Sequence, residues 1–182
     1  TSFRPQTSNS IVSGGPFDPQ KGVQYEFGAK ADLIQNRLLA TIAWFSIDKN
    51  NLLIPDVKDP LGIRQVQVNA VNSKGVELSV QGSITSALSL IANYSYTDAR
   101  FTEDAQNNQK GDRLINSPKH IFSAWANYDL KINDDSKLVV GAGARHFSDA
   151  VTAFSANPQT FLVPSYTVLD ASLGYFYQKV GL

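Results

Sequence analysis

Apolar and polar residues alternate along most of this chain with a period of two. Between Val23 and Leu33 the odd positions are apolar or small, and the even positions are Gln24, Glu26, Gly28, Lys30 and Asp32. Successive side chains of a strand point to opposite faces, so this pattern predicts a long strand with one apolar and one polar face. The same alternation predicts strands within residues 76–81, 88–96, 122–130 and 169–177.

Two further segments have less regular patterns. Residues 38–47 are apolar on both faces for much of their length, and residues 138–147 carry Gly141 and Gly143 on one face, which leaves their register open. We still expect both to be strands, because each lies between polar connections. Residues 1–3 are expected to be the stub of one more strand before Val23.

Strand length and loop length favour a membrane barrel over a sandwich. Globular strands usually have about 5–6 residues, whereas a tilted membrane-spanning strand needs roughly 9–11. The connections alternate between short ones (35–37, 83–87, 131–137) and longer ones (55–62, 102–118, 148–163). Outer-membrane barrels have short turns on one rim and long loops on the other, with aromatic residues near the strand ends. The predicted fold is therefore all-β, an antiparallel up-and-down meander of about seven to eight long strands from a transmembrane barrel.

Composition excludes several other classes of protein. The 182 residues include 16 Lys+Arg and 16 Asp+Glu, so no net charge indicates a nucleic-acid partner. The absence of cysteine rules out disulfides and thiolate metal sites. No apolar run approaches the roughly 20 residues of a membrane-spanning helix. The N-terminus does not resemble a signal peptide, and the C-terminus stops on a strand, so we expect a piece of a larger protein.

Several phrases occur in an order that resembles TonB-dependent ferric-siderophore receptors. They include FDPQKGVQYEFG at 17–28, AWFSIDKNN at 43–51, SKGVEL at 73–78, NYSYTDA at 93–99, GDR at 111–113, NSPKH at 116–120 and VPSYTVLD at 163–170. Each phrase is weak alone, but together they cover nearly the whole chain. The resemblance implies that residues 1–182 are part of the barrel domain, with the plug domain and the remaining strands absent.

The resemblance also implies a location and partners. Such receptors are multi-pass barrels of about 22 strands in the Gram-negative outer membrane, plugged by an N-terminal domain. They bind a ferric siderophore at the cell surface and import it with energy relayed by TonB. Iron arrives inside its chelator, so we expect no resident cofactor and no protein metal ligands. We expect contact with outer-membrane lipid and lipopolysaccharide, and with TonB through the absent N-terminal region. The isolated piece is expected to self-associate through its sheet edges or to cover them with its loops.

Candidate ligand-binding residues lie on or near the predicted long loops. Arg113 suits a carboxylate or hydroxamate-type oxygen, and Arg145 with His146 and the loop residues Phe154 and Phe161 would add charge and stacking. The alternative is that Arg145 pairs across the barrel wall and the phenylalanines pack the loop. The acidic pairs Glu103-Asp104 and Asp134-Asp135 are expected to be a solvated loop and a turn cap, not metal ligands.

No constellation predicts an enzyme. His120 and Ser123 would point to opposite faces of one strand, and His146 with Ser148 lacks the sharp turn that presents a nucleophile. Three alternatives to a siderophore receptor remain open: a complete small adhesive or structural barrel, a receptor for haem, cobalamin or a sugar, and an outer-membrane enzyme.

Overall fold

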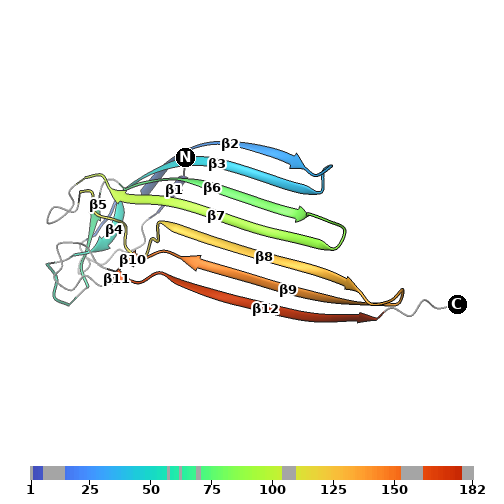
Figure 1. Ribbon diagram of the computed structural model, residues 1–182. Coiled ribbons are helices and arrows are strands. Elements are labelled where there is room, and N and C mark those ends of the chain that lie inside the picture. Colours follow the sequence, from blue (N-terminus) through green and yellow to red (C-terminus); the bar gives the residue numbers. More distant parts are fainter. Residues whose placement is uncertain are drawn as a thin grey trace.

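A computed structural model describes residues 2–5, 15–56, 58–61, 63–68, 71–103, 110–152 and 162–177. These form one layer of eight antiparallel strands, in the order β1-β2-β3-β6-β7-β8-β9-β12 (Figure 1). The strands are β1 (Ser2–Arg4), β2 (Gln20–Leu33), β3 (Leu38–Asn50), β6 (Val71–Ser83), β7 (Leu88–Phe101), β8 (His120–Lys131), β9 (Ser136–Phe147) and β12 (Tyr166–Tyr177). No helix within the described part of the chain is long and apolar enough to cross a membrane.

The predicted meander is confirmed. Each predicted strand lies inside an observed one, and β1 is the short strand before β2. The seven long strands have 12 to 14 residues. Two hairpins were not predicted: β4 (Leu52–Pro55) with β5 (Gln65–Val68), and β10 (Ala150–Val151) with β11 (Leu162–Val163). Strands of two to four residues are too short to give a recognisable period of two.

The two ends of the sheet differ, as the loop lengths predicted. Residues 34–37, 84–87 and 132–135 form tight turns at one end, which we call the turn end. The long connections and both small hairpins lie at the opposite end, the loop end (Figure 1). The expected Asp cap at 134–135 is wrong in detail. Asn133 accepts hydrogen bonds from the Asp135 amide (3.0 Å) and the Ser136 hydroxyl (2.7 Å), while Asp134 pairs with Lys131.

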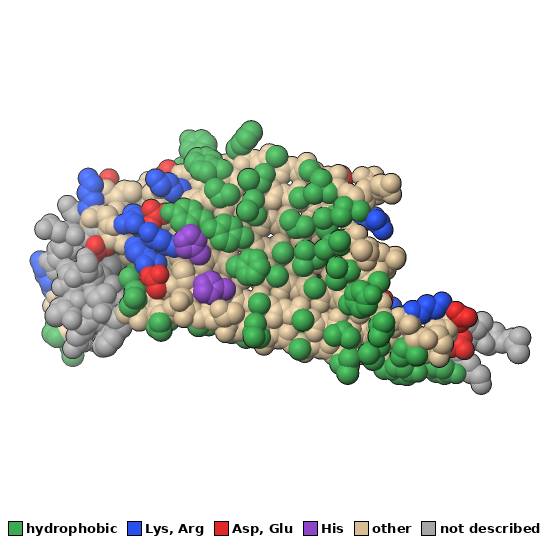
Figure 2. All heavy atoms as spheres, in the orientation of Figure 1, with side chains coloured by type: hydrophobic (Ala, Val, Ile, Leu, Met, Phe, Trp, Pro, Cys, Tyr) green, Lys and Arg blue, Asp and Glu red, His purple; other side chains and the backbone are tan. Residues whose placement is uncertain are grey.

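Register places the apolar positions of all the long strands on one face. Phe27 stands opposite Trp44, Trp44 opposite Val76, and Val76 opposite Tyr96. This apolar face also carries Ile42, Leu78, Ala92, Tyr94, Phe122, Ala124, Val140, Ala142, Leu169 and Leu173. Phe27 is 79% exposed and Leu169 is 78% exposed, and Figure 2 shows apolar side chains spread across this side. A face of this size left bare in water would be an association surface.

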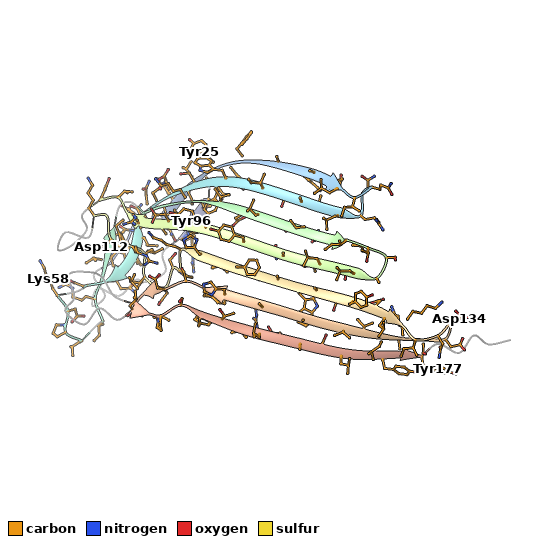
Figure 3. The ribbon with its side chains drawn as sticks, in the orientation of Figure 1. Tyr25, Lys58, Tyr96, Asp112, Asp134 and Tyr177 are labelled. Atoms are coloured by element: carbon orange, nitrogen blue, oxygen red, sulfur yellow. The ribbon has the colours of Figure 1, made fainter. Side chains whose placement is uncertain are left out.

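The apolar face is bordered by aromatic side chains at two levels. Tyr25 and Tyr96 lie toward the loop end, whereas Tyr177 lies at the turn end (Figure 3). Tyr128 and Tyr175, on the same face, are likewise near the turn end. Tyrosine and tryptophan favour the boundary between hydrocarbon and headgroups, so the two levels fit the aromatic girdles of a membrane barrel.

Aromatic rings packed on glycines explain the two irregular strand patterns. Phe45 on the polar face stands opposite Gly75, and a Cβ there would lie 2.8 Å from the Phe45 ring. Trp125 stands opposite Gly143 and also covers Gly141. Each glycine leaves room for a ring against the backbone, a known way of stabilising glycines within sheets. Gly141 and Gly143 of β9 therefore leave space on the polar face for the Trp125 ring.

A small hydrophobic core lies at the loop end of the polar face. Val71 and Phe101 are 2% and 1% exposed, and Leu52, Val66, Leu114 and Ile115 pack against them. These residues come from β4, β5 and the connection after β7, so the core holds the long loops on the sheet. Asp18 and Gln67 add two hydrogen bonds between the segment before β2 and the β4–β5 hairpin.

We predict that Gly143→Ala destabilises the wall. The new Cβ would collide with the Trp125 indole and lie 2.9 Å from the Ala124 carbonyl oxygen. Such overpacking typically costs about 1–3 kcal/mol, measured as the guanidinium unfolding free energy of the whole protein in detergent. Ala142→Val, on the exposed apolar face one residue away, is the matched control. Equal effects of the two substitutions would contradict the role given to the Trp125–Gly143 contact.

Candidate functional site

The polar face holds a cavity of about 590 Å³ that extends across β2, β3, β6, β7 and β8. Polar-face side chains in its lining include Glu26, Lys30, Glu77, Asn93 and Ser123. They reach one surface because alternate residues of neighbouring strands share a face. The cavity is open to one side, as expected for part of the inner surface of a wide barrel, and is not a closed pocket.

Charged groups in this cavity are incompletely paired. Glu26 accepts a hydrogen bond from the Gln24 amide at 2.9 Å. Glu77 and Lys30 have no ion-pair partner among the residues that the structure describes. Unpaired charges facing a polar space are suited to contact a further domain or a charged solute, because a partner there would form charge-assisted hydrogen bonds.

Arg145 lies on the polar face near the loop end of β9. Its guanidinium nitrogen is 3.2 Å from a carboxylate oxygen of Asp170 on β12, and its side chain is 55% exposed. The structure thus contains the cross-wall pair that was the alternative for Arg145. The printed contact uses one guanidinium nitrogen, and more than half of the side-chain surface remains exposed, which leaves donors for an anionic ligand. Ligand contact by Arg145 stays a prediction.

His146 lies on the opposite face from Arg145. Its register partners, Phe122 and Thr167, belong to the apolar face, and its Nδ1 is 2.9 Å from the Thr167 hydroxyl. The structure therefore does not bring His146 and Arg145 into one site. Ligand contact by His146 stays a prediction that would require a ligand on the outer surface of the wall.

Arg113 joins two long connections. Its guanidinium donates to the Asp149 carboxylate at 2.7 Å and to the Asp149 carbonyl at 3.0 Å, and the side chain is only 19% exposed. The hydrogen bond from Arg113 lowers the pKa of the Asp149 carboxyl below its ordinary value. Close by, the Asn116 amide donates to the Val151 carbonyl at 2.8 Å. Contact between Arg113 and a ligand stays a prediction, and it would compete with this ion pair.

Phe154 and Phe161 lie outside the described residues, so the structure does not place them. Asp149 and Asp170, the partners of the two arginines, were not predicted from the sequence. The alternation in residues 169–177 predicted that Asp170 lies on the polar face, but it could not predict that Arg145 is its partner. Asp149 had no sequence signal, because its contact spans two loops.

The described residues contain no group of three or more His, Asp or Glu side chains placed to hold a metal ion. His120 hydrogen-bonds through Nδ1 to the Tyr94 hydroxyl at 2.9 Å and lies beside the Tyr96 ring. Ser123 lies on the other face, as expected from the odd spacing. His120 therefore packs among the aromatic residues of the apolar face.

Comparison with known proteins agrees with this architecture. The family model described as TonB dependent receptor-like, beta-barrel, matches residues 1–181. The metal-pseudopaline receptor CntO of Pseudomonas aeruginosa is 34% identical over 174 residues, covering 96% of this chain and 24% of that protein. The ferrichrome outer membrane transporter/phage receptor of Escherichia coli K12 is 31% identical over 181 residues, covering 100% of this chain and 23% of that protein.

A solved structure shows the same likeness in three dimensions. The closed form of the ferric-catecholate import receptor Fiu from Escherichia coli K12 matches with a TM-score of 0.72 and 29% identity, covering 96% of this chain and 25% of that one. The chain spans about a quarter of the length of the relatives it matches. It belongs to the TonB-dependent receptor family and forms part of the β-barrel wall of an outer-membrane protein.

Proposed function

We propose that the protein containing this chain binds a ferric siderophore at the cell surface and imports it with energy supplied through TonB. The names of its relatives support this cargo class, since they are receptors or importers of ferrichrome, ferrioxamine B, a ferric catecholate and metal-pseudopaline. The proposed role is transport without chemical change, so the chain needs no catalytic group and no resident cofactor.

The observation that carries the proposal is the separation of the two faces. The apolar face suits lipid, and the polar face, with its cavity of about 590 Å³, suits the inside of a barrel. The polar face would surround a plug domain outside this chain, and Glu77 and Lys30, which have no ion-pair partner within the described part of the chain, are available to it. TonB would act through the same absent part of the protein.

Within this chain, Arg145 is the best-placed candidate for cargo contact. It lies on the inward, polar face two residues from the loop end of β9, and its side chain is 55% exposed. Guanidinium groups bind carboxylate and hydroxamate-type oxygens through paired hydrogen bonds. The proposed contact therefore uses donors that the ion pair with Asp170 does not occupy.

We predict that Arg145→Gln weakens cargo binding. Loss of a charge-assisted hydrogen bond should raise the dissociation constant about tenfold or more. The measurement is binding and uptake of radioiron-labelled chelates by cells carrying the full-length gene, using the chelate that a deletion strain fails to import.

Lys137→Gln is the matched control for Arg145→Gln. Lys137 lies on the same strand and face, in an ion pair with Asp129 at 2.6 Å, but at the turn end. It should leave binding unchanged at equal surface amounts of receptor. If both variants bind normally, cargo contact by Arg145 is refuted. If no chelate depends on the gene, the siderophore proposal itself fails.

The ion pair between Arg113 and Asp149 leads to a prediction about pH. The pKa of Asp149 is lower in the folded protein, so the pair stabilises the loops above the ordinary Asp pKa of about 3.9 and is lost as pH falls through the folded value. We expect hydrogen exchange of residues 110–119, corrected for intrinsic rates, to stay constant from about pH 8 to pH 5 and to accelerate below about pH 4.

Arg113→Ala should bring several-fold faster exchange in the same residues already at neutral pH, because the connection between the two loops is lost. Lys131→Ala removes an exposed ion pair at the turn end and serves as the control. Unchanged exchange in Arg113→Ala would show that this ion pair does not hold the loops together.

A further inference from the structure

Two aromatic rings are stacked on the polar face at the loop end of the wall. Phe147 of β9 and Tyr166 of β12 stand opposite each other, and their ring centroids are 5.0 Å apart with an interplanar angle of 21°. Phe147 also stands opposite Ile121 of β8, which lines the cavity of about 590 Å³. The stacked pair therefore belongs to the inward surface that borders this cavity, and not to the aromatic residues on the apolar face.

Arg145 lies next to the stacked pair on the same face. It stands opposite Val168, which is two residues along β12 from Tyr166, and residues two apart on a strand share a face. Asp170, which accepts the hydrogen bond of Arg145 at 3.2 Å, is two residues further toward the turn end. The order from the loop end is therefore aromatic rings, guanidinium and carboxylate. A solute that enters from the loop end meets the rings and the guanidinium before it reaches Asp170.

The chemistry of these side chains indicates what kind of solute they suit. Phe147 is half-buried and packs on the Tyr166 ring, whereas Tyr166 itself is 49% exposed. An exposed aromatic ring favours stacked or tilted contact with a further aromatic ring, and a guanidinium favours anionic oxygens. An aryl ring that carries anionic oxygens satisfies both. A chelator built of hydroxamate or carboxylate groups alone would use Arg145 and leave the rings without an aromatic partner.

We propose that Tyr166 is a specificity-determining residue, which selects ferric chelates with catecholate arms by stacking an aryl ring beside Arg145. This inference rests on the proposed function and narrows its cargo to one chemical class. Diagonal neighbours on paired strands, such as Tyr166 and Arg145, are about 7–8 Å apart. The iron-binding oxygens of a catecholate are attached directly to its ring. An arm that stacks on Tyr166 therefore brings its anionic oxygens within reach of the long Arg145 side chain.

The test measures equilibrium binding of two radioiron-labelled chelates, a tris-catecholate and a tris-hydroxamate, to the purified full-length receptor in detergent. The unchanged receptor should bind the catecholate chelate more tightly. Tyr166→Leu removes the ring and should weaken catecholate binding about three- to tenfold, the usual contribution of an aromatic pair. Its binding of the hydroxamate chelate should be unchanged, because that chelate has no ring to stack. Tyr166→Phe keeps the ring and should bind both chelates as the unchanged receptor does.

Tyr175→Leu is the matched control. Tyr175 lies on the same strand and is 61% exposed, but its register with Leu138 places it on the apolar face. Chelate binding should be unchanged in this variant at equal amounts of folded receptor. The inference is overturned if the receptor binds no catecholate chelate, if Tyr166→Leu binds it normally, or if Tyr166→Leu weakens both chelates equally. It is also overturned if Tyr166→Phe or Tyr175→Leu weakens catecholate binding as much as Tyr166→Leu does.

Failure of this inference is distinguishable from failure of the proposed function. A receptor that binds and imports the hydroxamate chelate but not the catecholate chelate keeps the siderophore proposal and refutes the selection by Tyr166. The siderophore proposal itself fails only if uptake of no chelate depends on the gene.

Discussion

Backbone hydrogen bonding between neighbouring strands is the constraint on which the rest of this structure depends. Hydrocarbon offers no partner to a bare amide or carbonyl, so a wall in lipid must satisfy these groups within its own sheet. The ladders run without interruption along the long strands, for example from Lys21–Asn50 to Leu33–Leu38 between β2 and β3. Once the backbone is paired this way, side chains can only point to one face or the other. The two faces then acquire different chemistry, one for lipid and one for the barrel interior.

The same constraint explains where irregular structure is found. Short turns suffice at the turn end, whereas the two extra hairpins and a small hydrophobic core are found at the loop end. There the Val71–Phe101 core and the Arg113–Asp149 pair hold long connections in place. The apolar face needs no core of its own, since its large side chains would be covered by lipid. The edge strands β1 and β12 remain available for pairing with further strands. This agrees with the chain spanning about a quarter of the length of its relatives.

Most of the wall could be predicted from the sequence, and most of the site could not. Period-two alternation located the long strands, because in a sheet with lipid on one side every second residue of each strand must be apolar. It was weakest at β3 and β9, where Phe45 and Trp125 lie over glycines of partner strands, an arrangement visible only once register is known. Loop lengths predicted the two rims but not the β4–β5 hairpin. Arg113 and Arg145 were recognised as candidates, yet their partners Asp149 and Asp170 depend on contacts between separate segments.

The most direct test of the account is the accessibility of single cysteines along β8 in the full-length receptor, from which any other cysteine has been removed. This chain contributes none of its own. Spin labels at Phe122, Ala124 and Ala126 would be compared with labels at Ser123 and Asn127, using oxygen and a water-soluble nickel complex as relaxing agents in a lipid bilayer. We predict that the first set is accessible to oxygen and shielded from nickel, and that the second set lacks this lipid signature. Accessibility that does not alternate along the strand would contradict the assignment of the two faces.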